Sequence, residues 1–201
     1  MSALPQLATR DKRVLLRWAR TALQCAAAGK PAATPARHDT LADALLEPQA
    51  VFVSLHTVRS HRLRGCIGCL EARHPLVEAV VENAYAAATR DPRFDAVRPD
   101  EVEHLEIEIS VLGSMVEVRD VLEIQVGRGG IGVSRDGRRG ILLPQVPVQL
   151  GWDRDTFLDN VCRKAELPAD AWRHGATIQR FVAVVFSEAH LAEGVPSDSD
   201  S

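Results

Sequence analysis

The chain has 201 residues, of which 46% are apolar and 25% are charged, and its net charge is -3 at pH 7. This composition is typical of a globular protein with one substantial domain, or one domain with a smaller lobe. The net charge argues against general binding to nucleic acid or to an anionic membrane, because either needs a basic face. There is no run of about 18 apolar residues, so no membrane span is expected. Four cysteines are too few for a disulfide scaffold, and without a signal-peptide core the expected location is the cytoplasm.

Helices are predicted wherever apolar residues recur at intervals of three and four. Residues 10–28 show this pattern and end at Gly29. A proline- and alanine-rich connector follows, with a short helical candidate at 41–46. The clearest helix is predicted over 75–89, since it opens with a proline and ends before Asp91-Pro92.

Strands are predicted from β-branched runs and strict alternation. Residues 51–58 (VFVSLHTV) read as a strand, and the segment 63–70 is expected to pair with it as a hairpin. Residues 105–112 (LEIEISVL) alternate between apolar and polar positions, which predicts a half-buried strand, most often antiparallel.

The second half of the chain carries a hairpin, a helix and a last strand. Residues 131–143 predict a hairpin with an Asp-Gly turn, and Asp153 is the expected N-cap of a helix over 154–166. The continuous apolar run 182–186 predicts a central strand.

Strands and helices occur in mixed order, without regular βαβ alternation. The expected class is therefore α+β, with a mainly antiparallel sheet and flanking helices. The expected domain covers 10–188, preceded by a flexible N-terminus at 1–9 and followed by a disordered acidic tail at 189–201.

The sequence Cys66-Ile67-Gly68-Cys69 is compatible with several kinds of functional site. A structural zinc site needs about four ligands, and this chain offers one Cys-x-x-Cys pair without a second pair or paired histidines. A thioredoxin-like pair opens a helix, whereas the next predicted helix begins several residues further on. No metal, cofactor or redox pair is therefore expected here.

Cys66 alone is a candidate nucleophile. Gly65 and Gly68 would allow close approach to a tight loop with clustered amide N–H groups, and Arg62 and Arg64 are cations that favour a thiolate. The competing interpretation is a turn or bulge with a small buried cysteine, and composition by itself favours that one.

Three further polar segments are ambiguous. Residues 89–94 (TRDPRF) predict either a salt-bridged helix stop or an arginine-lined anion site. The glycine-rich segment 127–132 lacks the Gly-Lys-Ser/Thr of a P-loop, so it is interpreted as a flexible turn into the hairpin. Residues 135–139 are interpreted as a solvated hairpin tip.

Taken together, these motifs resemble the AMMECR-one domain family. Residues 63–68 (LRGCIG) stand as the six-residue signature of that family, and the resemblance extends over about residues 10–188. The supporting segments are 51–55 (VFVSL), 90–94 (RDPRF), 108–112 (EISVL), 140–146 (GILLPQV), 152–153 (WD) and 157–165, which contains FL and CRKA. The family signature has one cysteine, so Cys69 is an addition of this chain and is not expected to share its chemistry.

The resemblance implies an α+β fold of two lobes, with a larger one around an antiparallel sheet. Bacterial and archaeal proteins of this kind resemble system protein A of the AmmeMemoRadiSam set, which implies a Memo-like protein and a radical SAM enzyme as partners. We expect a thiol-assisted modification of a small molecule or partner protein, or alternatively a non-enzymatic adaptor serving those partners. The candidate site consists of Cys66 as nucleophile, with Arg64, Gly65, Gly68, Arg90 and Arg93 contacting the substrate.

Overall fold

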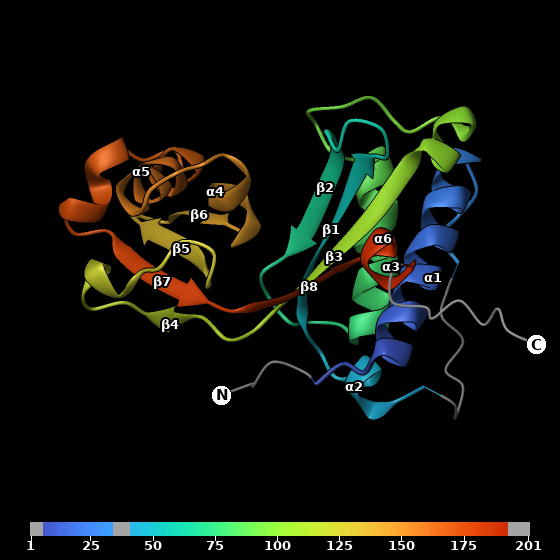
Figure 1. The fold of residues 1–201 in the computed structure, drawn as a ribbon, viewed down its shortest axis with the longest axis horizontal. Coiled ribbons are helices and arrows are strands. Elements are labelled where there is room, and N and C mark those ends of the chain that lie inside the picture. The colour runs from blue at the N-terminus through green and yellow to red at the C-terminus, as the bar shows by residue number, and fades with distance from the viewer. Residues whose placement is uncertain (1–5, 34–40, 193–201) are drawn as a thin grey trace, which may run out of the picture. The chain divides into compact units, whose positions relative to one another are not determined.

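The computed structural model describes residues 6–33 and 41–192 (Figure 1). They form helices and two antiparallel four-stranded sheets, and each sheet belongs to its own compact unit. The larger unit lies within 5–112 and 184–201, and the smaller unit is 113–183. The predicted α+β class with a larger and a smaller lobe is confirmed. Among the described helices, none is both long enough and apolar enough to cross a membrane.

The elements of each unit follow in chain order. The larger unit contains α1 (Thr9–Ala27), α2 (Asp43–Leu46), β1 (Ala50–Thr57), β2 (Leu63–Cys69), α3 (Leu76–Thr89), η1 (Pro99–His104), β3 (Leu105–Leu112), β8 (Ala183–Ser187) and α6 (Glu188–Ala192). The smaller unit contains β4 (Val116–Glu117), η2 (Val121–Glu123), β5 (Gly130–Arg135), β6 (Arg138–Leu142), α4 (Gln145–Gln149), α5 (Arg154–Lys164), η3 (Ala169–Arg173) and β7 (Thr177–Phe181).

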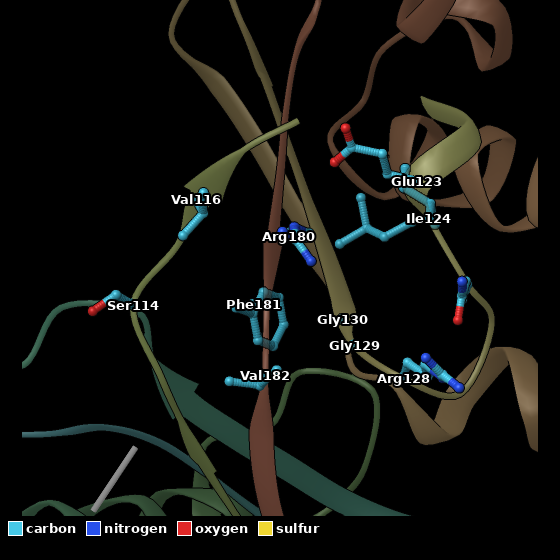
Figure 2. A pocket seen from close by; sticks show the side chains of 12 residues that line it. Ser114, Val116, Glu123, Ile124, Arg128, Gly129, Gly130, Arg180, Phe181 and Val182 are labelled. Carbon is cyan, nitrogen blue, oxygen red and sulfur yellow. The ribbon is translucent and has the colours of Figure 1, made fainter. Parts of the chain in front are cut away.

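The smaller unit is built on a sheet of order β4-β7-β5-β6, with α5 packed on β5 and β6. The predicted hairpin is present, and its turn residues Asp136 and Gly137 both have positive φ, as a tight two-residue turn requires. The predicted cap of α5 is also present, because Asp153 Oδ1 accepts a hydrogen bond from Thr156 N–H at 2.8 Å. Figure 2 shows part of this sheet, with Arg180 and Phe181 along β7.

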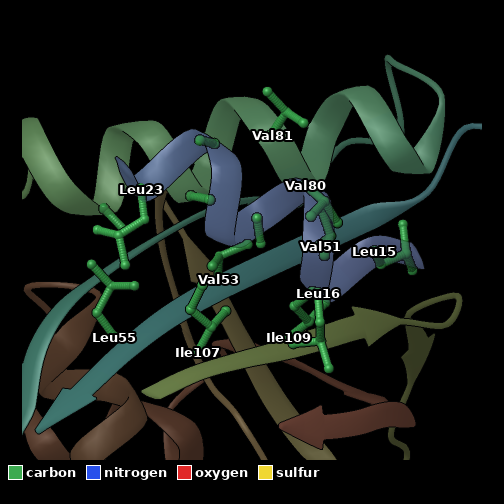
Figure 3. Close-up of a cluster of buried hydrophobic side chains, with 14 of the residues drawn as sticks. Leu15, Leu16, Leu23, Val51, Val53, Leu55, Val80, Val81, Ile107 and Ile109 are labelled. Carbon is green, nitrogen blue, oxygen red and sulfur yellow. The ribbon is translucent and has the colours of Figure 1, made fainter. Parts of the chain in front are cut away.

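The larger unit is a sheet of order β2-β1-β3-β8 with helices on one face. Helix α3 packs on β1 and β2, α1 packs on α3 and β3, and the apolar side chains of both helices meet those of the strands (Figure 3). The alternation predicted for 105–112 holds, since Ile107, Ile109 and Val111 are fully buried in this core. The helices at 10–28 and 75–89 and the hairpin of 51–58 with 63–70 are confirmed.

The run 182–186 was predicted as a central strand, and this is wrong. Strand β8 is the outermost strand of the larger sheet, beside β3, and Val182 lies outside it with 48% of its surface exposed. An apolar run predicts burial on both faces, but Ala183, Val184 and Val185 of β8 are only half-buried, as at the edge of a sheet. The preceding strand β7 was missed, because its short sequence Thr-Ile-Gln-Arg-Phe carries little apolar signal.

The structure describes elements at both ends of the expected domain. Leu7 packs against the core and α1 begins at Thr9, and at the other end α6 runs from Glu188 to Ala192. The domain boundaries at 10 and 188 stay predictions. Residues 1–5 and 193–201 lie outside the described residues.

Gly65 sets how closely β2 approaches α3. A Cβ at this position would collide with the backbone carbonyl oxygen of Ala87, and a helix backbone cannot move aside cheaply. We therefore expect Gly65→Ala to lower the free energy of unfolding by about 1–3 kcal/mol, as overpacking does in other cores. Urea unfolding followed by circular dichroism measures this.

The control is Gly132→Ala in strand β5. A Cβ there would meet only ordinary contacts, the nearest at 3.5 Å from Ile141. A change of less than about 0.5 kcal/mol is expected for it, as for substitutions without a collision. Equal losses in both variants would contradict the role of the Gly65 contact.

Candidate functional site

Cys66 lies in the middle of strand β2, and the expected tight loop is not observed. The pairing of β1 with β2 is continuous through this point, with Cys66 opposite Ser54. The loop interpretation was wrong because it treated the flanking glycines as a turn signal. Their neighbours in space show that they serve packing within a regular strand.

At both Gly65 and Gly68, the place that a side chain would take is filled by another part of the protein. The place of a Cβ on Gly65 is taken by the Ala87 carbonyl, and that on Gly68 by the ring of Phe52 on the neighbouring strand. An aromatic ring over a cross-strand glycine is a known way of covering an exposed stretch of sheet. Both glycines are therefore explained by contacts within the protein.

The Cys66 thiol lies on the sheet face opposite the helices. Ser54 Oγ donates a hydrogen bond to Cys66 Sγ at 3.2 Å. Since the Cys66 N–H points away from β1, the two residues form a non-hydrogen-bonded pair, the kind whose side chains lie closer together. On the other side of Ser54, strand β3 places Glu108 opposite it. A thiol, a hydroxyl and a carboxylate thus follow one another across three strands.

The free edge of β2 is covered by Asp91 and Arg93. The Cys66 N–H donates to Asp91 Oδ2 at 2.8 Å. Arg93 donates from Nε to Asp91 Oδ1 at 2.9 Å and from Nη2 to Oδ2 at 2.7 Å, and Nη2 also lies 3.5 Å from the Cys66 carbonyl oxygen. An edge strand needs such partners, because its unpaired backbone groups otherwise invite another strand.

Asp91 is buried, with 2% of its side chain exposed, and it is held ionised. Hydrogen bonds from Arg93 lower its pKa from 3.8 to about 2, with help from the N–H groups of Cys66 and Arg93 and against the opposing effect of burial. The pKa of Arg93 is raised, first by Asp91 and further by the nearby Cys66 side chain. The guanidinium therefore lies close enough to the thiol to act on it electrostatically.

Arg64 and Arg93 flank the ring of Phe94. Their guanidinium carbons lie 5.9 and 5.5 Å from the ring centroid, within the range of cation–π attraction. Arg64 is also paired with Glu101 at 2.9 Å and is 16% exposed, whereas 53% of the Arg93 side chain is exposed. Arg93 is thus the more accessible of the two for an incoming anion.

Arg90, a predicted site residue, lies outside this cluster, and so does Cys69, which was not expected to take part. Arg90 is exposed at the end of α3, and none of the hydrogen bonds or ion pairs found among the described residues joins its side chain to Cys66 or Asp91. Cys69 donates from Sγ to the Glu71 carbonyl oxygen at 3.2 Å. The sequence pattern did not point to Ser54 and Glu108, because only the strand register places Ser54 beside Cys66 and Glu108 beside Ser54.

The Cys-x-x-Cys spacing has a different meaning in a strand. Residues three apart in a strand point to opposite faces of the sheet and lie about 10 Å apart, too far for a disulfide. None of the four cysteines, Cys66 and Cys69 included, takes part in a disulfide. Within the described residues, no group of three or more His, Cys, Asp or Glu side chains is placed to hold a metal ion.

The low pKa of Asp91 predicts how stability depends on pH. The contribution is present above the ordinary value of 3.8 and is lost as the pH falls toward about 2. Asp91→Asn should therefore lower the free energy of unfolding at pH 7 by about 2 kcal/mol, the equivalent of this shift. The difference between the variant and the natural chain should shrink as the pH falls below 4, because Asn does not titrate.

Urea unfolding at pH 7, and in steps down to about pH 2.5, measures this difference. Asp100→Asn is the control, since Asp100 pairs with Arg98 at an exposed position and such pairs contribute little. A difference that stays constant with pH would show that Asp91 acts through its shape and not through its charge.

The sequence and the fold match one known family. The family model described as AMMECR1 matches residues 16–186. Protein MK0488 of Methanopyrus kandleri is 49% identical over 152 residues, which cover 72% of this chain and 73% of that protein. Protein MJ0810 of Methanocaldococcus jannaschii is 39% identical over 180 residues, covering 86% and 88%.

A solved structure has the same fold. The crystal structure of the uncharacterized protein PH0010 from Pyrococcus horikoshii matches with a TM-score of 0.80 at 37% sequence identity, over 87% of this chain and 89% of that one. The resemblance inferred from the motifs is confirmed, and the chain belongs to the AMMECR1 family.

Proposed function

We propose that the chain carries out a thiol-dependent modification of a small molecule or of a partner protein, with Cys66 as the reacting group. The observation that carries the proposal is the half-buried residue Cys66, whose sulfur accepts a hydrogen bond from Ser54 and whose carbonyl oxygen lies 3.5 Å from Arg93 Nη2. A hydrogen-bond donor and a cation both stabilise a negatively charged sulfur, the form in which cysteine attacks electrophiles.

The reaction that fits this arrangement is transfer of an acyl group. The Cys66 thiol loses its proton to solvent, its sulfur forms a bond to the carbonyl carbon, and the leaving group departs with its bonding electrons. Asp91 is a poor base for the thiol proton, because Arg93 lowers its pKa to about 2. The resulting thioester is then cleaved by water or by an acceptor.

Arg93 suits a substrate that carries an anionic group near the reacting carbon. Half of its side chain is exposed, and it retains N–H donors beyond those that bond to Asp91. Arg64 is enclosed by Glu101 and by the carbonyl oxygen of Asp95, so its role is to hold the surrounding loop. Gly65 and Gly68 act by holding Cys66 in place.

A second candidate is a non-enzymatic adaptor for a Memo-like protein and a radical SAM enzyme, as the family resemblance implies. The contacts of the signature favour it: both glycines are filled by neighbouring groups, and Asp91 and Arg93 cover the edge of β2. On this proposal residues 63–68 form a rigid frame, and the partner binds to the surface that they support.

The rate of alkylation by iodoacetamide separates the two candidates. In the folded chain at pH 7 we expect Cys66 to be alkylated faster than Cys69, which is also partly exposed on β2 and serves as the matched internal control. Ser54→Ala should slow alkylation of Cys66 by about tenfold, the effect of losing one hydrogen bond to a charged group. Mass spectrometry of tryptic peptides gives both rates.

Alkylation of Cys66 only after unfolding in urea would refute the thiol reaction. The adaptor proposal would then be tested with purified Memo-like and radical SAM proteins from the same genome. It expects calorimetric binding of at least one of them, and equal affinity for the Cys66→Ala variant. Absence of binding to either protein would refute the adaptor as well.

A further inference from the structure

The smaller unit contains a cavity that the sequence interpretation did not anticipate. Its volume is about 370 Å³, within the range of small-molecule sites. Three segments line it: the stretch 114–116 leading into β4, the loop 123–130, and residues 180–182 at the end of β7 (Figure 2). The loop includes the glycine-rich stretch that sequence reasoning treated only as a turn.

Arg180 occupies a position of β7 at which the alternation of the strand predicts an apolar side chain. It lies on the same face of β7 as Ile178, which is buried in the core of this unit. Its cross-strand neighbours are Val116 on β4 and Ile131 on β5, and Ile131 is 1% exposed. Arg180 thus lies on the face of the sheet that packs against the core of this unit, and it lines the cavity there.

Two arginines line the cavity without a carboxylate partner. Arg128 and Arg180 take part in none of the ion pairs found among the described residues, and neither does Glu123, the one acidic residue of the lining. Other arginines of this unit do bond to the protein: Arg135 to the His174 carbonyl oxygen, and Arg173 to Asp155. The cavity therefore carries a net positive charge that the protein does not neutralise.

The loop wall is fixed by close packing on Phe181. A Cβ on Gly129 would lie 2.8 Å from the Phe181 carbonyl oxygen, and one on Gly130 would collide with the Phe181 ring. Glycine at both positions lets the loop lie close to β7, and Arg128 is part of this loop. Val116, Ile124 and Val182 complete an apolar lining around the two charges.

We propose that this cavity binds a small organic anion, with a carboxylate or phosphate group joined to an apolar body about the size of an aromatic ring. The anionic group bonds to Arg128 and Arg180, and the apolar body contacts Val116, Ile124 and Phe181. A guanidinium pairs well with either oxyanion, because its donors match two oxygens at once. This site shares no residue with the thiol proposal and does not depend on it.

The test is isothermal titration of the full chain with phenyl phosphate, benzoate and inorganic phosphate. Phenyl phosphate should bind about tenfold more tightly than inorganic phosphate, because the ring buries apolar surface. Benzoate binding distinguishes a carboxylate site from a phosphate site, and either result agrees with the proposal as long as one aromatic anion binds. Added salt should weaken binding, because the arginines are accessible to solvent.

Arg180→Gln should weaken binding of the aromatic anion by about tenfold, the effect of losing one charged hydrogen bond. Arg139→Gln is the matched control, since Arg139 is an exposed arginine on β6 of the same unit and does not line the cavity. Its affinity should equal that of the natural chain. If Arg180→Gln does not fold, the affinity of Arg128→Gln for the aromatic anion provides the same test, because Arg128 lies in an exposed loop.

Three outcomes would overturn the proposal. One is that neither aromatic anion binds more tightly than inorganic phosphate. Another is that Arg139→Gln weakens binding as much as the two cavity variants do. The third is that Arg128→Gln and a folded Arg180→Gln both bind with unchanged affinity.

Discussion

The carboxylate of Asp91 is the contact on which the edge of the larger sheet depends. It joins the end of α3 to the backbone of β2 through the Cys66 N–H, and Arg93 keeps it ionised although it is buried. A buried carboxylate is tolerated only when it is paired and hydrogen-bonded, and here both conditions are met. The helix end, the edge strand and the environment of the thiol are thereby fixed together.

The same contact relates the packing role of residues 63–68 to the chemistry proposed for Cys66. Gly65 and Gly68 let β2 lie against α3 on one face and under Phe52 on the other, which leaves Cys66 as the side chain directed toward Ser54. The packing of this strand is therefore compatible with the proposed reaction at Cys66. Asp91, Gly65 and Gly68 hold β2 in place, and the position of β2 decides which groups the Cys66 sulfur contacts.

The two units use arginine in different ways. In the larger unit, Arg64 and Arg93 are paired with Glu101 and Asp91, and their charges serve mainly to hold loops against the sheet. In the smaller unit, Arg128 and Arg180 line a cavity, and no ion pair among the described residues includes them. A guanidinium without a carboxylate partner has its charge and its donors available to a ligand, which is the basis of the anion site proposed for this unit.

The sequence by itself determined the longer helices, most of the strands and the α+β class, because apolar spacing reports which face of each element is buried. It also singled out residues 63–68 around Cys66, but it took a regular strand for a tight loop. Only the tertiary structure decided that β8 is an edge strand, that Cys66 and Cys69 face opposite ways, and that Arg180 opens into a cavity. Each of these depends on strand register and on contacts between residues far apart in the chain, such as Cys66 with Asp91. Local periodicity carries no information about such pairings, because many partners satisfy the same pattern of burial.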